Sequence, residues 1–304
     1  MKSTKLPYPD QDEAAFNIEP VEVGLRKNRP RSKLLAEKQT GKRYLGGKNM
    51  NKFKNPVSAG QASRLILRHY FQALEQAVDS DVIIVGAGPS GLVCAFELGE
   101  KGYDVTLIDR HLVPGGGIWG GATSFNKVIL QKDVDNILTE FGIPYQEDDQ
   151  ALVVSALTLA SKLIFAASSH PKVKLFNLMT AEDIHCTEGK VDGVVIISSA
   201  IEVSGLHVDP MVLMSKAVLD ATGHDAVIAN LYSRRIPLQI TKESFMNPLQ
   251  GEEDVIRNTR MIAPGLFVAG MAATNISGGC RMGPIFGGML LSGKKAAQLI
   301  AEYI

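Results

Sequence analysis

Residues 81–110, "DVIIVGAGPSGLVCAFELGEKGYDVTLIDR", contain the strongest indication of the fold in this sequence. Its apolar pattern predicts a short buried strand over residues 81–85, a helix over 90–101 and a second strand over 104–108. A strand, a helix and a strand in this order form one unit of a parallel sheet. The stretch therefore predicts an α/β protein built on a central parallel sheet.

The turn between the first strand and the helix has the glycine spacing of a dinucleotide-binding fold. Gly86 permits the tight turn, Gly88 lets the backbone approach a pyrophosphate, and Gly91 lets the helix pack closely on the strand. The helix N-terminus adds N–H donors for the phosphates. Asp109 ends the next strand, where a carboxylate accepts hydrogen bonds from an adenosine ribose that carries no 2′-phosphate. The pattern predicts a bound dinucleotide.

Shorter apolar runs predict the remaining elements. The glycine-rich loop "VPGGGIWGGA" is expected to lead into a helix that ends near Phe141. Further strands are expected near residues 151–154, 173–176, 191–198, 217–221 and 265–270, and further helices over 58–78 and 284–304.

Composition limits the class of protein. The chain has 304 residues, is 45% hydrophobic and has a formal net charge of zero, so it can bury a large core and shows no global preference for nucleic acid. No apolar run reaches the roughly 18 residues that span a bilayer, and the N-terminus lacks the apolar segment of a secretion signal. Cys94, Cys186 and Cys280 show no paired spacing. We therefore expect a cytoplasmic protein with neither membrane nor nucleic-acid partners.

Residues 1–49 differ from the rest of the chain. They are polar, basic and without helical or strand periodicity, which predicts a flexible arm ahead of one domain over 50–304. A tail that binds nucleic acid or a partner protein is a second interpretation. A third is that translation begins at Met50, because "LGGKNM" (45–50) can be encoded by GGAGGU, a ribosome-binding sequence, shortly before AUG.

Two strand ends resemble those of flavoproteins with two dinucleotide folds. Ala221, Thr222 and Gly223 follow a hydrophobic run, as in the ATG motif of those proteins. In "VAGM", however, Met271 stands where flavoproteins usually carry an aspartate, and a methionine cannot make the same polar contact with a flavin. We expect a flavoprotein-like, glutathione-reductase-type fold with an additional small β-sheet, and the pattern leaves the flavin itself in question.

Four polar residues are candidates for chemistry. His207 and Asp209 in "GLHVDP" and His224 in "DATGHD" have side chains that suit divalent iron. The alternative is that the histidines end strands and Asp209 caps a helix that begins near Pro210. Arg281, in a glycine-rich turn, either clamps a carboxylate in bidentate fashion or forms an ordinary ion pair.

Six segments taken together resemble the thiamine thiazole synthase family. They run in the family's order from about Met50 to the C-terminus: "DVIIVGAGPSGL", "PGGGIWGG", "GLHVDP", "DATGHD", "VAGM" and "RMGPIFGGMLLSGKKAA". The resemblance implies that NAD is a consumed substrate. It loses nicotinamide, condenses with glycine and gains sulfur to give an ADP-linked thiazole carboxylate, the precursor of the thiazole half of thiamine. Fe(II) would hold the glycine-derived imine and deliver sulfur, in a ring-like homo-octamer.

The resemblance also implies roles for individual residues. Asp209 and His224 would bind the iron, contributed by one subunit or by adjacent subunits, and Arg281 would hold the glycine carboxylate. In addition to the turn glycines Gly86, Gly88 and Gly91, the NAD contacts would be Ser90, Asp109, Arg110, Gly117, Ala181, His207 and Met271.

His207 distinguishes two kinds of family member. Eukaryotic members carry a cysteine there that gives up its sulfur in a single turnover, whereas archaeal-type members carry histidine and use free sulfide. The resemblance thus implies a multi-turnover, sulfide-dependent catalyst, with Cys280 beside Arg281 as the rival sulfur source. Two other classes stay open on sequence alone: an FAD-dependent oxidoreductase and a non-catalytic nucleotide sensor.

Overall fold

The computed structural model of the protein describes residues 53, 55–121 and 123–304. The interpretations of residues 1–49 as an arm, a tail or an untranslated leader therefore lie outside the described residues. The compact unit that carries the helices and strands below is Ala59–Ile304.

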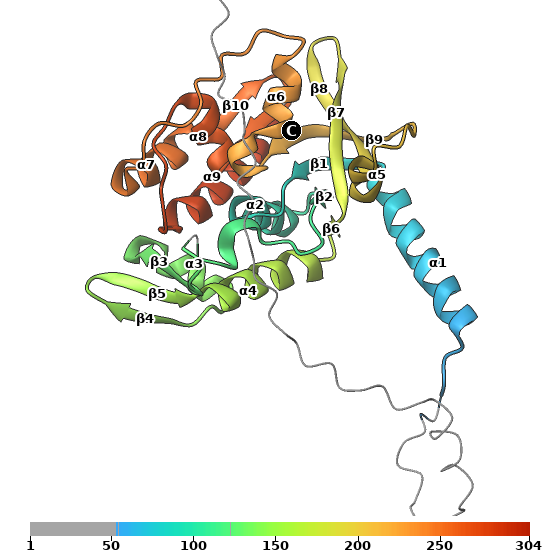
Figure 1. Cartoon of the computed structure of the whole chain (residues 1–304), viewed down its shortest axis with the longest axis horizontal. Coiled ribbons are helices and arrows are strands. Elements are labelled where there is room, and N and C mark those ends of the chain that lie inside the picture. Colours follow the sequence, from blue (N-terminus) through green and yellow to red (C-terminus); the bar gives the residue numbers. More distant parts are fainter. Residues whose placement is uncertain (1–52, 54, 122) are drawn as a thin grey trace, which may run out of the picture. The chain divides into compact units, whose positions relative to one another are not determined.

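A central sheet of mostly parallel strands forms the middle of this unit (Figure 1). Its main path runs β10-β11-β9-β1-β2-β6. All neighbours on this path are parallel except β10 and β11, which are antiparallel. The strands are β1 (Asp79–Val85), β2 (Val105–Ile108), β6 (Val173–Phe176), β9 (Met211–Asp220), β10 (Arg260–Ala263) and β11 (Leu266–Val268).

Two antiparallel additions complete the β structure. The hairpin of β7 (Met179–Thr187) and β8 (Lys190–Ser198) joins the central sheet through β9. A separate three-stranded sheet has the order β3-β5-β4, with β3 at Lys127–Gln131, β4 at Tyr145–Asp148 and β5 at Ala151–Ser155. This architecture confirms the predicted fold class, an α/β fold with a central, mostly parallel sheet and a small second sheet.

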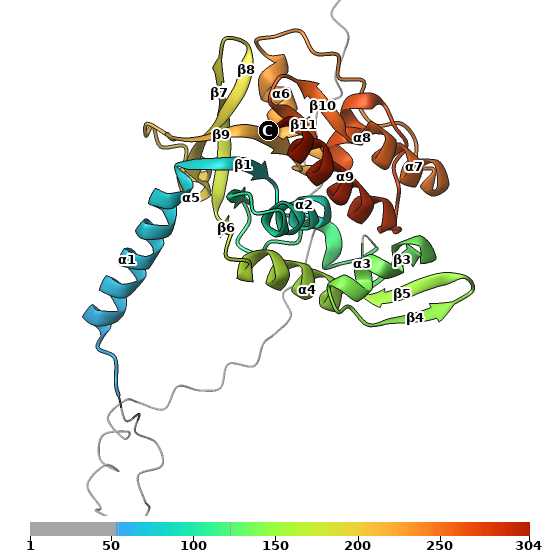
Figure 2. The same cartoon turned by 180° about the vertical axis from the view of Figure 1, so that it is seen from behind.

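Helices cover both faces of the central sheet, as Figure 2 shows from behind. Because side chains alternate across a strand, Val82 and Ile84 of β1 join one buried cluster and Ile83 and Val85 the other. The helices are α1 (Ala59–Ala77), α2 (Pro89–Glu100), α3 (Asp135–Glu140), α4 (Ala156–Ser169), α5 (Ser199–Ser204), α6 (Val227–Ser233), α7 (Pro248–Asn258), α8 (Met271–Ser277) and α9 (Gly287–Tyr303). Short 3-10 turns lie at η3 (Gly116–Ile118), η4 (Lys132–Val134) and η5 (Gly223–Asp225).

The structure corrects two expectations. The helix expected to reach Phe141 is in fact η3, β3, η4 and α3, because residues 127–131 bury every second side chain and thus follow the strand period. No helix begins near Pro210, since β9 starts directly after it at Met211, so Asp209 is not a helix cap. Helices α4 to α8 and strands β4, β7 and β10 had not been predicted.

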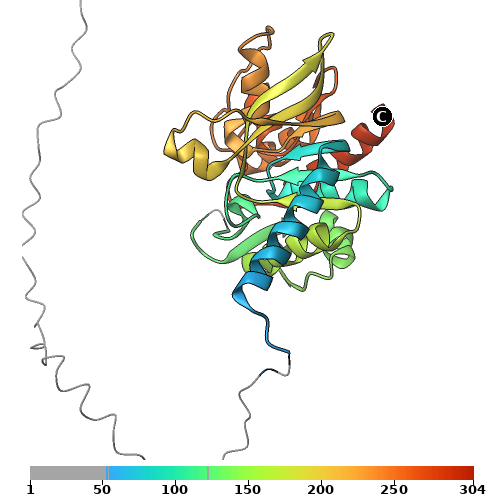
Figure 3. The ribbon, with the colours of Figure 1, turned by 90° about the vertical axis from the view of Figure 1, so that its right-hand side faces the viewer.

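Helix α1 buries little of its apolar surface. Only Leu74 and Ala77 of its side chains are buried. Its exposed apolar side chains are Leu65, Ile66, Leu67, Tyr70 and Phe71. Figure 3 shows α1 on the side of the body that faces the viewer, and Figure 1 shows that its N-terminal end projects away from the body. Among the described residues, no helix combines the length and hydropathy needed to cross a membrane.

Candidate functional site

Several predicted residues meet at one edge of the central sheet. Gly86 follows β1, Asp109 follows β2, His224 lies just beyond β9, and Met271 lies just beyond β11. Because these four strands are parallel, their carboxyl ends point to the same edge. In open α/β sheets the crevice outside these ends is where ligands bind.

The glycine turn leaves room for a ligand at one position only. Gly86 has φ = +102°, and a Cβ there would lie 2.4 Å from the Ala221 carbonyl oxygen. A Cβ on Gly91 would lie 2.0 Å from the Gly86 carbonyl oxygen. At Gly88, the N-cap of α2, no atom comes within 4 Å of the Cβ position. Packing therefore requires the first and third glycines, while the second is open to an approaching group.

A second glycine-rich loop lies against this turn. The Gly115 N–H donates to the Ala87 carbonyl oxygen at 2.7 Å, and a Cβ on Gly116 would lie 3.3 Å from the Gly88 Cα. The predicted contact Gly117 follows in η3 and is exposed, with open space at its Cβ position. The two loops together form a backbone surface at the end of β1.

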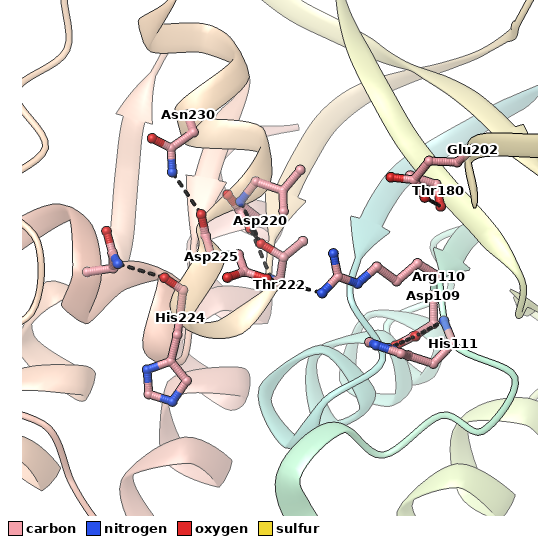
Figure 4. Close-up of polar contacts among 12 residues, drawn as sticks. Asp109, Arg110, His111, Thr180, Glu202, Asp220, Thr222, His224, Asp225 and Asn230 are labelled. Carbon is pink, nitrogen blue, oxygen red and sulfur yellow. Dashed lines mark hydrogen bonds and ion pairs between the residues drawn. The ribbon is translucent and has the colours of Figure 1, made fainter. Parts of the chain in front are cut away.

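Asp109, at the end of β2, stabilises the glycine turn that follows β1. Its side chain is nearly buried, and its Oδ2 accepts a hydrogen bond from the Ala87 N–H at 2.8 Å. Its Oδ1 accepts from the His111 N–H at 2.8 Å and lies 3.0 Å from His111 Nδ1 (Figure 4). Each carboxylate oxygen can accept a second bond, so these contacts remain compatible with the expected ribose contact.

Three other expected NAD contacts are buried. The Ser90 hydroxyl donates to the Met289 carbonyl oxygen at 2.9 Å and thereby links α2 to α9. Ala181 lies within β7, and Met271 opens α8 directly after Gly270, which has φ = +61°.

Arg110 reaches across the edge of the sheet. Its Nη2 lies 3.2 Å from Asp225 Oδ2, and both side chains are exposed (Figure 4). Because Asp225 is the neighbour of His224, this pair joins the end of β2 to the segment that carries the predicted metal ligand.

The segment of His224 is anchored by Asp220, a residue that the sequence analysis did not single out. The carboxylate is fully buried and accepts bonds from the Thr222 N–H, the Thr222 hydroxyl and the Ala229 N–H. Burial raises the pKa of this carboxyl above its ordinary value. The bonds hold the ATG segment against the start of α6, and Figure 4 shows Asp220 and Thr222 beside His224.

His224 and Arg281 meet at a third residue, Glu243. The Nδ1 atom of His224 lies 2.5 Å from Glu243 Oε1, and Arg281 Nε lies 3.4 Å from Glu243 Oε2. The Glu243 side chain is 12% exposed, against 55% for His224 and 52% for Arg281. Glu243 lies in "TKESF", which has no recognisable motif, so the sequence held no signal for it.

His207 and Asp209 are not near His224 in the same chain. Both are exposed in the loop between α5 and β9, whereas His224 follows the other end of β9. Ten strand residues span about 30 Å. Consistently, no group of three or more His, Cys, Asp or Glu that could hold a metal occurs within the described part of one chain. Within one chain, the described residues therefore do not bring the expected iron pair together.

The cysteines occupy three different surroundings. Cys94 is buried in α2, as its apolar neighbours indicated, and burial raises the pKa of its thiol. Cys186 is exposed in β7. Cys280 is half-buried, and its N–H donates to Asp254 Oδ2 at 2.9 Å.

Known proteins are similar to this chain in sequence and in fold. Residues 63–286 match the Thi4 family. A thiamine thiazole synthase of Pyrococcus abyssi is 45% identical over 246 residues, covering 79% of this chain and 96% of that protein. One of Methanoculleus marisnigri is 42% identical over 242 residues, covering 79% and 95%. The crystal structure of Thermovibrio ammonificans THI4 is 39% identical with a TM-score of 0.78, covering 82% of this chain and 98% of that one. The chain therefore belongs to the Thi4 family.

Proposed function

We propose that this protein is a thiamine thiazole synthase that makes an ADP-linked thiazole carboxylate from NAD, glycine and free sulfide, with Fe(II), over many turnovers. The observation that carries the proposal is the grouping of His224 and Arg281 on one carboxylate, Glu243, at the strand edge that also holds the glycine turn. Membership of the Thi4 family and the curated thiamine thiazole synthases among its relatives support the thiazole chemistry.

The proposed NAD site uses the backbone surface at the end of β1. The open position at Gly88 and the N-terminus of the 12-residue helix α2 suit a pyrophosphate. Asp109, held against Ala87, is placed one strand away, where the adenosine ribose would lie. Arg110 and Gly117 flank this surface and are both exposed.

The proposed iron site uses Asp209 of one subunit and His224 of another. An imidazole with one nitrogen bonded to a carboxylate leaves the other nitrogen for a metal, which is the usual arrangement of metal-binding histidines. Fe(II) held there would supply open coordination positions for sulfide and the glycine-derived group. Arg281 would hold the glycine carboxylate beside it.

The need for a second subunit is supported by exposed apolar surface. Around Asp209, the side chains of Leu206, Val208 and Met211 are exposed, as is most of the apolar surface of α1. Apolar surface of this extent stabilises an assembly when another copy covers it. We propose a homo-oligomer, an octamer in keeping with the family resemblance.

The proposed sulfur source is free sulfide, because the imidazole of His207 has no sulfur to donate. The test is an anaerobic incubation with NAD, glycine, sulfide and Fe(II), followed by mass spectrometry for the adenylated thiazole. We expect several equivalents per chain, and no product from Asp209→Ala or His224→Ala.

Control experiments distinguish the possible sulfur sources and the other two classes of protein. Cys280→Ala should still turn over repeatedly, and Cys186→Ala, on an exposed strand, serves as its matched control. A yield of one equivalent per chain, with a cysteine converted to dehydroalanine, would refute the sulfide mechanism. A yellow, flavin-containing protein would favour an oxidoreductase, and NAD recovered intact would favour a nucleotide sensor.

A further inference from the structure

We infer that Glu243 is a positioning residue that couples the metal ligand to the glycine clamp. One of its carboxylate oxygens orients His224, and the other orients Arg281. This inference rests on the proposed function, because it takes His224 as a metal ligand and Arg281 as the group that holds the substrate carboxylate.

The contact with His224 fixes which ring nitrogen is available. Glu243 Oε1 is 2.5 Å from Nδ1, and a carboxylate can only accept, so Nδ1 carries the hydrogen. In that tautomer the ring lone pair is on the other nitrogen, Nε2. The backbone of His224 is held as well, since its carbonyl oxygen accepts a bond from the Asn275 side chain at 2.6 Å. The ring is thus prepared to bind a metal through Nε2.

The contact with Arg281 selects an edge of the guanidinium. Glu243 Oε2 lies 3.4 Å from Nε. The two terminal nitrogens remain free of this contact, and together they form the edge that binds a carboxylate with two parallel hydrogen bonds. The carboxylate of Glu243 therefore orients both the imidazole of His224 and the guanidinium of Arg281.

Backbone hydrogen bonds join the segment around Glu243 to the segment that leads to Arg281. The Thr241 N–H donates to the Ile276 carbonyl oxygen at 3.1 Å, and the Ser244 N–H donates to the Gly279 carbonyl oxygen at 2.9 Å. Arg281 itself donates its N–H to the Phe245 carbonyl oxygen at 3.2 Å. These bonds lie on both sides of Glu243, so its nearly buried side chain has a fixed base from which to orient its more exposed partners.

The test measures metal affinity directly in the assembled, full-length protein. Anaerobic equilibrium dialysis with Co(II) alone gives the dissociation constant without any turnover. We expect Glu243→Gln to weaken Co(II) binding about 10- to 100-fold, because only one of the two terminal atoms of glutamine is an acceptor and its NH₂ group would face the N–H of the other partner. We also expect KM for glycine to rise by more than kcat falls.

A matched variant makes the same chemical change elsewhere. Glu253 is exposed on α7, and Glu253→Gln should bind Co(II) and glycine as the unchanged protein does. Wild-type Co(II) affinity in a folded Glu243→Gln protein would overturn the inference. If that variant does not fold, Glu243→Asp keeps the charge but is one methylene shorter, and unchanged Co(II) affinity in it would overturn the inference equally.

The dialysis also separates this inference from the proposed function. Suppose that the unchanged protein makes no thiazole, while the Glu243→Gln variant binds Co(II) more weakly than the unchanged protein. The proposed reaction then fails, and the positioning of His224 by Glu243 stands. If thiazole forms and Co(II) affinity does not change, the proposed reaction stands and the role of Glu243 fails.

Discussion

Among single residues, the glycines of the turn after β1 have different roles, one in folding and one in ligand binding. Gly91 contacts the backbone of Gly86, whereas Gly88 has free space around its Cβ position and an ordinary extended backbone conformation. The same added methyl group should therefore have opposite effects at the two positions.

We expect Gly91→Ala to destabilise the fold by about 1–3 kcal/mol or more, because its methyl group overlaps the Gly86 carbonyl oxygen. Gly88→Ala should keep the Tm of the unchanged protein but bind NAD about 10-fold or more weakly, since its methyl group occupies the space through which a pyrophosphate approaches. Thermal unfolding and NAD dialysis on both variants test this. Unchanged NAD affinity in Gly88→Ala would place the nucleotide elsewhere.

At the scale of elements, the Arg281 loop depends on a buried carboxylate in α7. Burial acts to raise the pKa of Asp254, but hydrogen bonds from the Cys280 N–H, Gln250 and Arg257 outweigh it and hold the pKa below its ordinary value of 3.8. The charged form is thus the one that the fold prefers, and it ties α7 to the residue next to Arg281.

This preference predicts a pH dependence of stability. A carboxyl with a lowered pKa stabilises the fold at pH values above 3.8, and the contribution is lost as the pH falls through its folded-state pKa. We expect Asp254→Asn to lower the free energy of unfolding by about 1–3 kcal/mol at pH 7 and to shrink that difference below pH 4. Urea unfolding of both proteins, once at pH 7 and once below pH 4, measures this difference in the free energy of unfolding. A difference that stays constant with pH would show that the charge of Asp254 has no part in it.

The elements also show where sequence patterns suffice. The unit at residues 81–110 combined a buried run, a glycine turn and a second buried run, and its predicted strand–helix–strand order is confirmed. The segment before Phe141 was assigned to a helix, yet β3 forms there because its residues pair with β5. Pairing with a distant strand is a tertiary contact, and the three-residue apolar run Val128–Leu130 alone does not reveal it.

At the scale of the whole molecule, the ligands proposed for iron lie at opposite ends of β9. The 10-residue strand, about 30 Å long, separates the loop that carries Asp209 from the turn that carries His224 in one chain. The proposed iron site would then require two subunits, and defects in different subunits should complement one another.

We expect a co-expressed mixture of Asp209→Ala and His224→Ala chains to recover about a quarter of the thiazole-forming activity, because random assembly pairs two intact ligands in about one site of four. Each variant alone should be inactive. The measurement is product per chain in the purified mixed oligomer. No recovery from such an oligomer would mean that both ligands act from the same chain.

The apolar surface of α1 leads to a second prediction at this scale. Phe71 and Ile66 are exposed on a helix that buries only two side chains against its own chain. We expect Phe71→Glu combined with Ile66→Glu to reduce the oligomer to smaller species and to abolish Co(II) binding at micromolar metal. Analytical ultracentrifugation checks the assembly. An unchanged oligomer would show that this face of α1 is not an interface.

The glycine turn and the carboxylate at the end of β2 could be predicted from the amino-acid sequence, because each depends on residues close together in the chain. The fold class and the family resemblance could also be predicted, because short local motifs occur in a fixed order along the chain. Contacts between distant residues became visible only in the folded chain. It joined Glu243 to His224 and Arg281 through bonds between the segments around residues 241–247 and 276–281, and it separated Asp209 from His224 by the length of β9. Local patterns carry no information on such contacts, because strand pairing and side-chain packing set them once the chain has folded.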